Sequence, residues 1–198
     1  MSEPSTSPEP PSPDPPPRKK KRRRVLVAGL GLPWLRDLDY GTQFVRRVEG
    51  ETWPRGVYVE DLSVSAHRVL DRLKELKPHK VVLVAGMPRD VDPAGTIRRY
   101  KLDITPPEDG ADLAERIGES IGGIIDLDHT LAIGKWGKGF PEDTVVIEVE
   151  PGDRSFGLGF SEEVEASVDK VLALIREELG MDSGDNEVRG SVNAEGAS

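Results

Sequence analysis

The sequence predicts a three-layer α/β fold, in which a mainly parallel, twisted sheet carries helices on both of its faces. Short, valine-rich apolar segments recur along the chain, the clearest at residues 81–85 and 144–149. Segments with apolar residues at helical spacing lie between them, as at residues 66–76. Alternation of buried strands with amphipathic helices is typical of a parallel sheet that is covered on both sides.

The first half of the chain predicts strands and helices in strict alternation. The apolar runs predict strands at residues 25–29, 57–59 and 81–85. Apolar side chains at helical spacing predict helices at residues 39–48 and 66–76. The second helix has two candidate N-caps, Ser63 and Ser65, and Pro78 ends it.

The second half predicts a less regular path. The expected elements are a turn at 92–95, an edge strand at 96–102, two helices around a loop at Gly122-Gly123 within 111–136, a strand at 144–149, and a last helix over 162–175 that Ser161 caps. In a sheet of this kind, ligands bind beyond the carboxyl ends of the strands. The loops that follow Ala28, Tyr58, Ala85 and Val149 are therefore the expected location of a site.

Both ends of the chain have the composition of solvated tails. The first 17 residues hold eight prolines and no large apolar side chain, and the last 18 are rich in Gly, Ser, Asp and Asn. Such segments bury too little apolar surface to offset the entropy lost on ordering. We therefore expect three parts: a Pro-rich tail over 1–24 that ends in a basic run, one α/β domain over 25–180, and a second tail over 181–198.

Charge is distributed unevenly along the 198 residues. The chain carries a net charge of −9, and residues 25–180 hold 29 acidic against 19 basic side chains, a balance of −10. An acidic domain repels phosphate backbones, which argues against nucleic-acid binding by the folded part. The basic run at 18–24 has several interpretations, namely a solubilising collar, a tether to nucleic acid or anionic membrane, or a nuclear-import signal.

The chain has no cysteine and no apolar segment near the roughly 20 residues that span a membrane. Disulfides are therefore excluded, and a cytoplasmic location is expected. The segment Gly29-Leu30-Gly31 begins like a dinucleotide-binding loop, but Trp34 stands where that loop needs a third glycine. No Walker lysine follows either, so we expect a tight turn here and no nucleotide cofactor.

Four segments together resemble hydrogenase maturation endopeptidases. They are residues 29–41 (GLGLPWLRDLDYG), 93–98 (PAGTIR), 150–152 (EPG) and 156–164 (FGLGFSEEV). The first is similar to the family's opening motif G-x-G-N-P-x-x-x-D-[DE]-G-x-G, and the others to its E-P-G-T-x-R and closing E-P…G-x-G-L-S-x-E-V segments. His129 stands where the family has a histidine ahead of its last strand.

The resemblance implies a phosphorylase/hydrolase-like fold and a reaction, namely hydrolysis of one peptide bond near the C-terminus of a nickel-containing hydrogenase large subunit. It also implies that two carboxylates and a histidine recognise the metal that the partner subunit carries. Nickel accepts imidazole and carboxylate ligands, and a metal can polarise a carbonyl or generate hydroxide. A serine or cysteine nucleophile is then unnecessary, and we assign no catalytic residue.

This sequence departs from the family at the implied carboxylate positions. Leu38 stands at the first, and Ala85 or Gly86 at the second, depending on a one-residue gap. Aliphatic groups cannot coordinate a cation, and only His129 keeps a ligand type. Asp37 and Asp39 flank Leu38 and are the candidate replacements.

The sequence thus predicts a site for nickel or another divalent metal at Asp37, Asp39 and His129. Each residue has an alternative role: helix N-capping for the two aspartates and a hydrogen-bonded structural position for the histidine. Asp90 and Asp92, a few residues beyond Ala85, are further candidates, with a solvated turn as their alternative.

Two functions are compatible with these residues. The first is a divergent metal-dependent endopeptidase that cleaves or recognises the C-terminal region of a metal-containing partner, such as a hydrogenase large subunit. The second is a non-catalytic relative that binds a protein or a small ligand. Trp34, Trp53 and Trp136 are its candidate contact residues, with semi-buried packing as their alternative.

Overall fold

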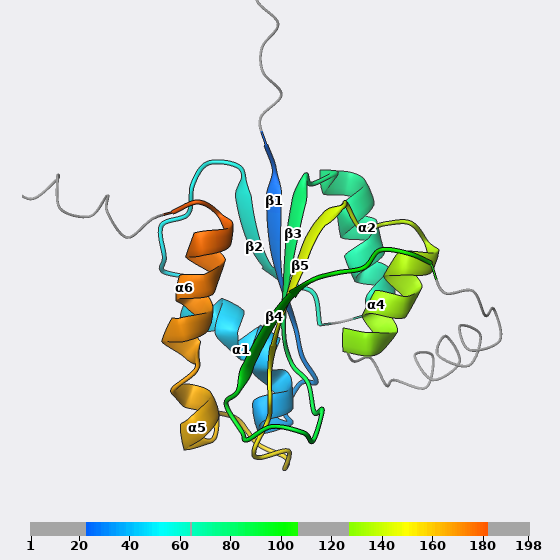
Figure 1. Cartoon of the computed structure of the whole chain (residues 1–198). Helices are drawn as coiled ribbons and strands as arrows, with labels where there is room; N and C mark the ends of the chain where they lie inside the picture. The colour runs from blue at the N-terminus through cyan, green and yellow to red at the C-terminus, as the bar shows by residue number, and fades with distance from the viewer. Residues whose placement is uncertain (1–22, 64, 107–126, 182–198) are drawn as a thin grey trace, which may run out of the picture.

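The computed structural model describes residues 23–63, 65–106 and 127–181. The elements in chain order are β1 (Val25–Leu30), the 3₁₀ turn η1 (Arg36–Asp39), α1 (Tyr40–Arg47), β2 (Val57–Asp61), α2 (Ala66–Leu76), β3 (Lys80–Gly86), β4 (Ile97–Lys101), α4 (Leu127–Trp136), β5 (Asp143–Val149), α5 (Glu162–Glu165) and α6 (Val168–Glu178). Figure 1 shows them gathered around one central sheet.

The sheet has the strand order β2-β1-β3-β5-β4. The first four strands are parallel to one another, and β4 pairs antiparallel with β5 at one edge. In this register Ala85 of β3 lies beside Leu30 of β1 and Glu148 of β5. The prediction of a mainly parallel sheet with an edge strand near residues 96–102 is confirmed.

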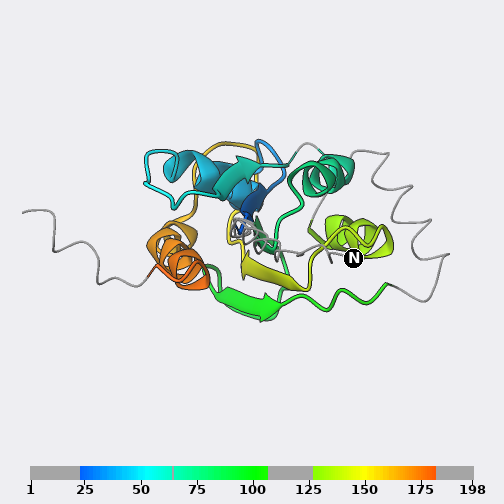
Figure 2. The ribbon, with the colours of Figure 1, turned by 90° about the horizontal axis from the view of Figure 1, so that it is seen from above.

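Helices cover both faces of the sheet, as predicted. Viewed from above, α1 and α6 lie on one side and α2 and α4 on the other (Figure 2). Two apolar clusters fill the spaces between the layers, one around Leu83 beneath α2 and α4, the other around Ile147 beneath α1 and α6. β3, which is apolar from Val81 to Ala85, contributes to both clusters because successive side chains of a strand point to opposite faces.

Serine side chains lie at three helix ends; the predicted cap of α2 is confirmed, and the prediction for the last helix is wrong. Ser65 caps α2 by accepting a hydrogen bond from the Arg68 amide at 3.1 Å. Ser161 precedes α5 but makes no capping bond; its hydroxyl donates to Asp37 instead. The prediction of one last helix is also wrong, because the segment forms two helices. α5 ends at Glu165, and α6 begins after Ser167, whose hydroxyl donates to the Val164 carbonyl at 2.6 Å.

Parts of the predicted organisation fall outside the described residues. The predicted helix pair over 111–136 is seen only as α4, which confirms its second member. Most of both predicted tails, and so the basic run apart from Arg23 and Arg24, also lies outside the described ranges. Within those ranges, no helix is long and apolar enough to cross a membrane.

Candidate functional site at the carboxyl edge of the sheet

A small pocket opens where β1 and β3 end. Its volume is about 90 Å³. The residues that line it are almost all apolar, namely Leu30, Gly31, Leu32, Leu38, Ala85, Gly86, Met87, Pro88 and Leu127. This edge holds the carboxyl ends of the parallel strands, where a site was expected.

The two positions that the resemblance assigns to carboxylates can now be placed. Leu38 and Ala85 both line the pocket. Gly86 also borders it, but a β-carbon added to Gly86 would lie 2.2 Å from the Asp37 carbonyl oxygen. Since no side chain fits at Gly86, Ala85 is the residue from which a side chain can face the pocket. The pocket therefore presents hydrocarbon at both positions.

Asp37 points into the body of the protein, toward the loop that follows β5. It is fully buried. Its carboxylate accepts hydrogen bonds from the amides of Gly152, Asp153 and Ser161 at 2.9, 2.7 and 2.8 Å, and from the Ser161 hydroxyl at 2.8 Å. Four donors occupy the lone pairs of this carboxylate, so its role is to hold the 152–161 loop against η1.

Asp39 is buried beside Gly31, at the start of α1. Its side chain is 2% exposed, and Oδ1 has no hydrogen-bond partner within the described residues. Burial, reinforced by the nearby Asp61 carboxylate, raises the pKa of Asp39 above its usual value. Neither Asp37 nor Asp39 makes a capping hydrogen bond to η1 or α1, so the capping alternative is wrong for both.

The three predicted metal ligands do not form a common centre. His129 lies in α4, is 7% exposed and interacts with a neighbouring group of the fold. Throughout the part of the chain that the structure describes, no three His, Cys, Asp or Glu side chains are grouped so that they could hold a metal ion. Asp37, Asp39 and His129 as arranged here therefore do not fit a divalent cation.

The alternative ligands Asp90 and Asp92 are engaged in ion pairs at the surface. Asp90 pairs with Arg154, and Asp92 pairs with Arg98 at 2.5 Å. Both aspartates are exposed. The solvated-turn alternative describes them better than metal ligation does.

An ion network beside the pocket was not predicted. Glu148 is almost fully buried, 1% exposed, in β5. Its carboxylate accepts two hydrogen bonds from Arg89, at 2.5 and 3.1 Å, and one from the Tyr100 hydroxyl at 2.6 Å. Arg89 also donates to both oxygens of Asp128 at 2.8 and 2.9 Å. Hydrogen bonds to Glu148 and then to Asp128 raise the pKa of Arg89.

A second buried glutamate, Glu150, continues this network along the loop after β3. It accepts from the backbone amides of Arg89 and Asp90 at 3.0 and 3.1 Å and from the Arg98 guanidinium at 2.8 Å. The sequence signals were an acidic residue inside strand 144–149, another directly after it, and the family-like segments 93–98 and 150–152, which contain Arg98 and Glu150. Together Glu148 and Glu150 fix the loop that carries Met87 and Pro88 into the pocket wall.

Comparison with solved structures identifies the fold. A hydrogenase 2 maturation peptidase from Thaumarchaeota archaeon SCGC_AB-539-E09 matches with a TM-score of 0.58 and 24% identity, over 81% of this chain and 100% of that one. An endopeptidase from Escherichia coli matches with a TM-score of 0.59 and 20% identity, over 79% and 91%. The hydrogenase maturating endopeptidase HybD from E. coli gives 0.55 and 20%, over 78% and 93%. This chain has the fold of the hydrogenase maturation peptidases.

No protein-family model and no curated protein sequence matches the chain. The maturation-peptidase fold is therefore recognised through the structure, at low sequence identity. Within that fold, the chain combines an apolar pocket with a buried aspartate, Asp37, whose four hydrogen bonds secure the loop after β5.

Proposed function

We propose that this protein is a divergent relative of the hydrogenase maturation peptidases that recognises the C-terminal region of a metal-containing partner subunit. The observation that carries the proposal is the extent of the structural match, which takes in the whole length of one solved hydrogenase maturation peptidase and more than nine tenths of a second one and of a further endopeptidase. The pocket supports it, because it lies at the strand ends where α/β folds bind their ligands.

The chemistry of the pocket favours recognition without metal-dependent cleavage. Leu38 and Ala85 offer no ligand atom, and the described residues hold no group of three metal-ligating side chains. An apolar pocket can take up an aliphatic part of a peptide by removing hydrocarbon from water. We therefore assign binding of the partner to this edge of the sheet and no bond-breaking step to its side chains.

Peptides from the C-terminal extension of a nickel hydrogenase large subunit test the proposal. Binding is measured by fluorescence polarisation with labelled peptide, and cleavage by mass spectrometry, each with nickel and with a chelator. We expect binding tighter than millimolar, which corresponds to about −4 kcal/mol, and intact peptide in both conditions. Absence of binding would refute recognition, and chelator-sensitive cleavage would refute the non-cleaving interpretation.

A pair of substitutions tests whether apolar residues at the two family positions are what excludes metal. The double variant Leu38→Glu, Ala85→Asp places two carboxylates in one pocket. Calorimetry should show at least a tenfold gain in nickel affinity over the unmodified protein, which corresponds to about 1.4 kcal/mol. The matched control Gly86→Asp should lower stability without that gain, because its β-carbon has no room beside the Asp37 carbonyl.

A further inference from the structure

Three large apolar side chains are exposed together at the carboxyl edge of the sheet. Trp34 is 56% exposed, Phe156 79% and Leu158 57%. We call these three residues the apolar rim. Trp34 lies two residues after Leu32, which lines the pocket, so one loop contributes to both the pocket and the rim. Exposed apolar side chains that cluster in this way commonly mark a surface that binds another molecule.

Backbone hydrogen bonds join the two loops that carry the rim. The Gly157 amide donates to the Trp34 carbonyl at 2.7 Å, and the Arg36 amide donates to the Gly157 carbonyl at 3.2 Å. Leu35 and Gly157 form a parallel bridge between them. Trp34 and the pair Phe156 and Leu158 are therefore neighbours in space, although more than 120 residues separate them in sequence.

Buried polar side chains support these loops from below. Asp37 binds the start and the end of the 152–161 loop through four hydrogen bonds. Gln43, also buried, accepts from the Gly159 amide at 2.9 Å and donates to the Arg36 carbonyl at 2.8 Å. The apolar rim is thus presented on a fixed backbone, and a fixed surface loses less conformational entropy when it binds.

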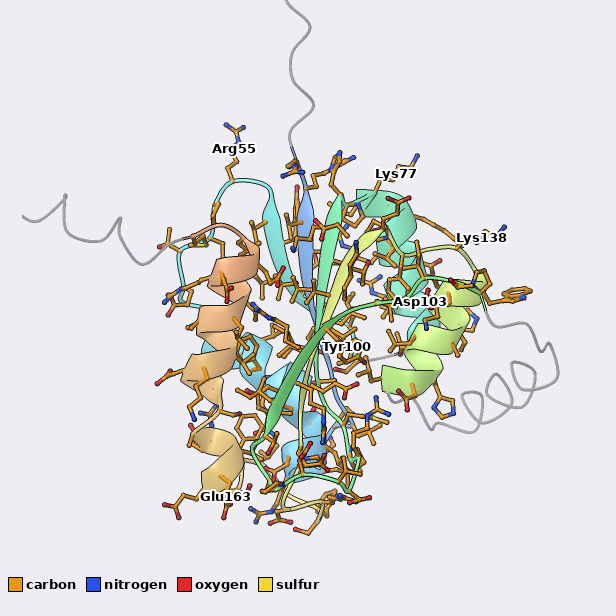
Figure 3. All side chains as sticks on the ribbon, viewed as in Figure 1. Arg55, Lys77, Tyr100, Asp103, Lys138 and Glu163 are labelled. Atoms are coloured by element: carbon orange, nitrogen blue, oxygen red, sulfur yellow. The ribbon has the colours of Figure 1, made fainter. Side chains whose placement is uncertain are left out.

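The charge around the rim indicates which partner fits. In the described loops of this edge, 31–39, 61–63, 87–96 and 150–163, six Asp and Glu side chains that are not buried outnumber three Arg, a balance of −3. At the opposite edge, residues 23–24, 49–56, 77–79 and 137–142 hold five Lys and Arg against three Glu, a balance of +2. Figure 3 shows the contrast, with Arg55, Lys77 and Lys138 at one end of the molecule and Glu163 at the other.

We propose that the apolar rim docks a basic, extended segment of a partner protein, in which a large apolar side chain is flanked by lysine or arginine. The apolar side chain packs against Trp34, Phe156 and Leu158. The flanking cations lie over the acidic loops, where Glu162 and Glu163 are exposed next to the rim loop. Opposite charge on the two surfaces also speeds the encounter. The inference rests on the proposed function, since the segment belongs to the same partner whose C-terminal region reaches the pocket.

A synthetic peptide tests the surface with the full chain. The probe is a fluorescein-labelled dodecamer with a central Leu and Phe flanked on each side by two lysines. We expect it to bind tighter than millimolar, with Trp34→Ala and Phe156→Ala each weakening it at least tenfold. Trp136→Ala is the matched control, because Trp136 is equally exposed, at 59%, but lies at the end of α4 that leads to the amino end of β5. It should change the affinity less than twofold.

Two further comparisons separate the possible failures. Replacing the four lysines of the peptide by glutamate should lower its affinity for the protein at least tenfold. Equal affinity of the two peptides would refute the preference for a basic segment. Equal effects of Trp34→Ala and Trp136→Ala on the affinity, or no binding by the unmodified protein, would overturn the proposal that the apolar rim docks the peptide. The hydrogenase C-terminal peptide is measured in parallel: if it binds the unmodified protein and the rim variants equally, the rim is refuted and the proposed function stands. If it fails to bind while the lysine peptide binds, the proposed function is refuted instead.

Discussion

Asp37 is a buried carboxylate whose partners are all more than 110 residues away in sequence. Replacing it with alanine leaves three backbone amides and one hydroxyl without their acceptor inside the protein. Hydrogen bonds to a charged group contribute about 1.5–3 kcal/mol each, and buried donors left unpaired add to the loss. We expect Asp37→Ala to lower the free energy of unfolding by about 3 kcal/mol or more in urea denaturation. Asp71→Ala, on the exposed face of α2, should cost less than about 0.5 kcal/mol; equal effects would contradict this role.

Asp39 makes stability depend on pH in the opposite direction from most aspartates. Its pKa is raised by burial, so between the usual value of 3.8 and the raised value the folded state holds more protons than the unfolded state. Stability therefore falls as pH rises through that window and does not recover above it. Asp39→Asn cannot ionise, so at pH 7 it should be more stable than the unmodified protein.

Urea denaturation at pH 3.5, 5 and 7 checks this prediction. The difference between the two proteins should be smallest at the lowest pH, where Asp39 is mostly protonated in both states. For the exposed control Asp71→Asn, the difference in unfolding free energy from the unmodified protein should not change in this way with pH. A variant that is less stable than the unmodified protein at pH 7 would mean that the ionised carboxylate is stabilising after all.

At the scale of elements, α1 depends on one glycine for its contact with the sheet. A β-carbon on Gly41 would lie 2.1 Å from the Leu30 amide nitrogen and 2.6 Å from the Val84 carbonyl oxygen. The helix would have to move off β1 and β3, and overpacking of this kind typically costs about 1–3 kcal/mol, sometimes more. Gly41→Ala should therefore lower the unfolding free energy by about 3 kcal/mol. Gly50→Ala is the control, because its β-carbon would meet nothing within 4 Å, and a change under about 0.5 kcal/mol is expected there.

At the scale of the whole molecule, the packed layers lie within residues 23–181, and the apolar clusters that hold them together are built from β-strands and helices inside that range. The composition of the segments 1–22 and 182–198, which is poor in apolar side chains, predicts that they add nothing to a core. A chain of residues 23–181 should therefore unfold within about 3 °C of the full chain, since each 1 kcal/mol shifts the melting temperature of a domain of this size by about 2–4 °C. Thermal unfolding followed by circular dichroism measures this, and a drop of 10 °C would show that a tail contributes to the fold.

The layered fold could be predicted because it depends on local patterns. Residues 81–85 are apolar over their whole length and residues 144–149 at four of six positions, which is typical of strands covered on both faces, and α2 shows its buried stripe in sequence. The place of the pocket followed from the same patterns, since parallel strands put their carboxyl ends at one edge. The sequence also showed that Leu38 and Ala85 stand at the two implied carboxylate positions, and that these positions therefore lack ligand atoms.

The tertiary structure alone decided what the polar residues do. The sequence offered Asp37, Asp39 and His129 as one metal site, but Asp37 faces a loop 115 residues further along the chain, Asp39 lies against Gly31, and His129 is buried in α4. Likewise Ser161 serves Asp37 and not its own helix. Burial can be predicted from the local spacing of apolar side chains, because each element presents one or two faces to the core. Hydrogen-bond partners depend on which segments, distant in sequence, come together in the fold, and the spacing of residues along the chain does not predict this.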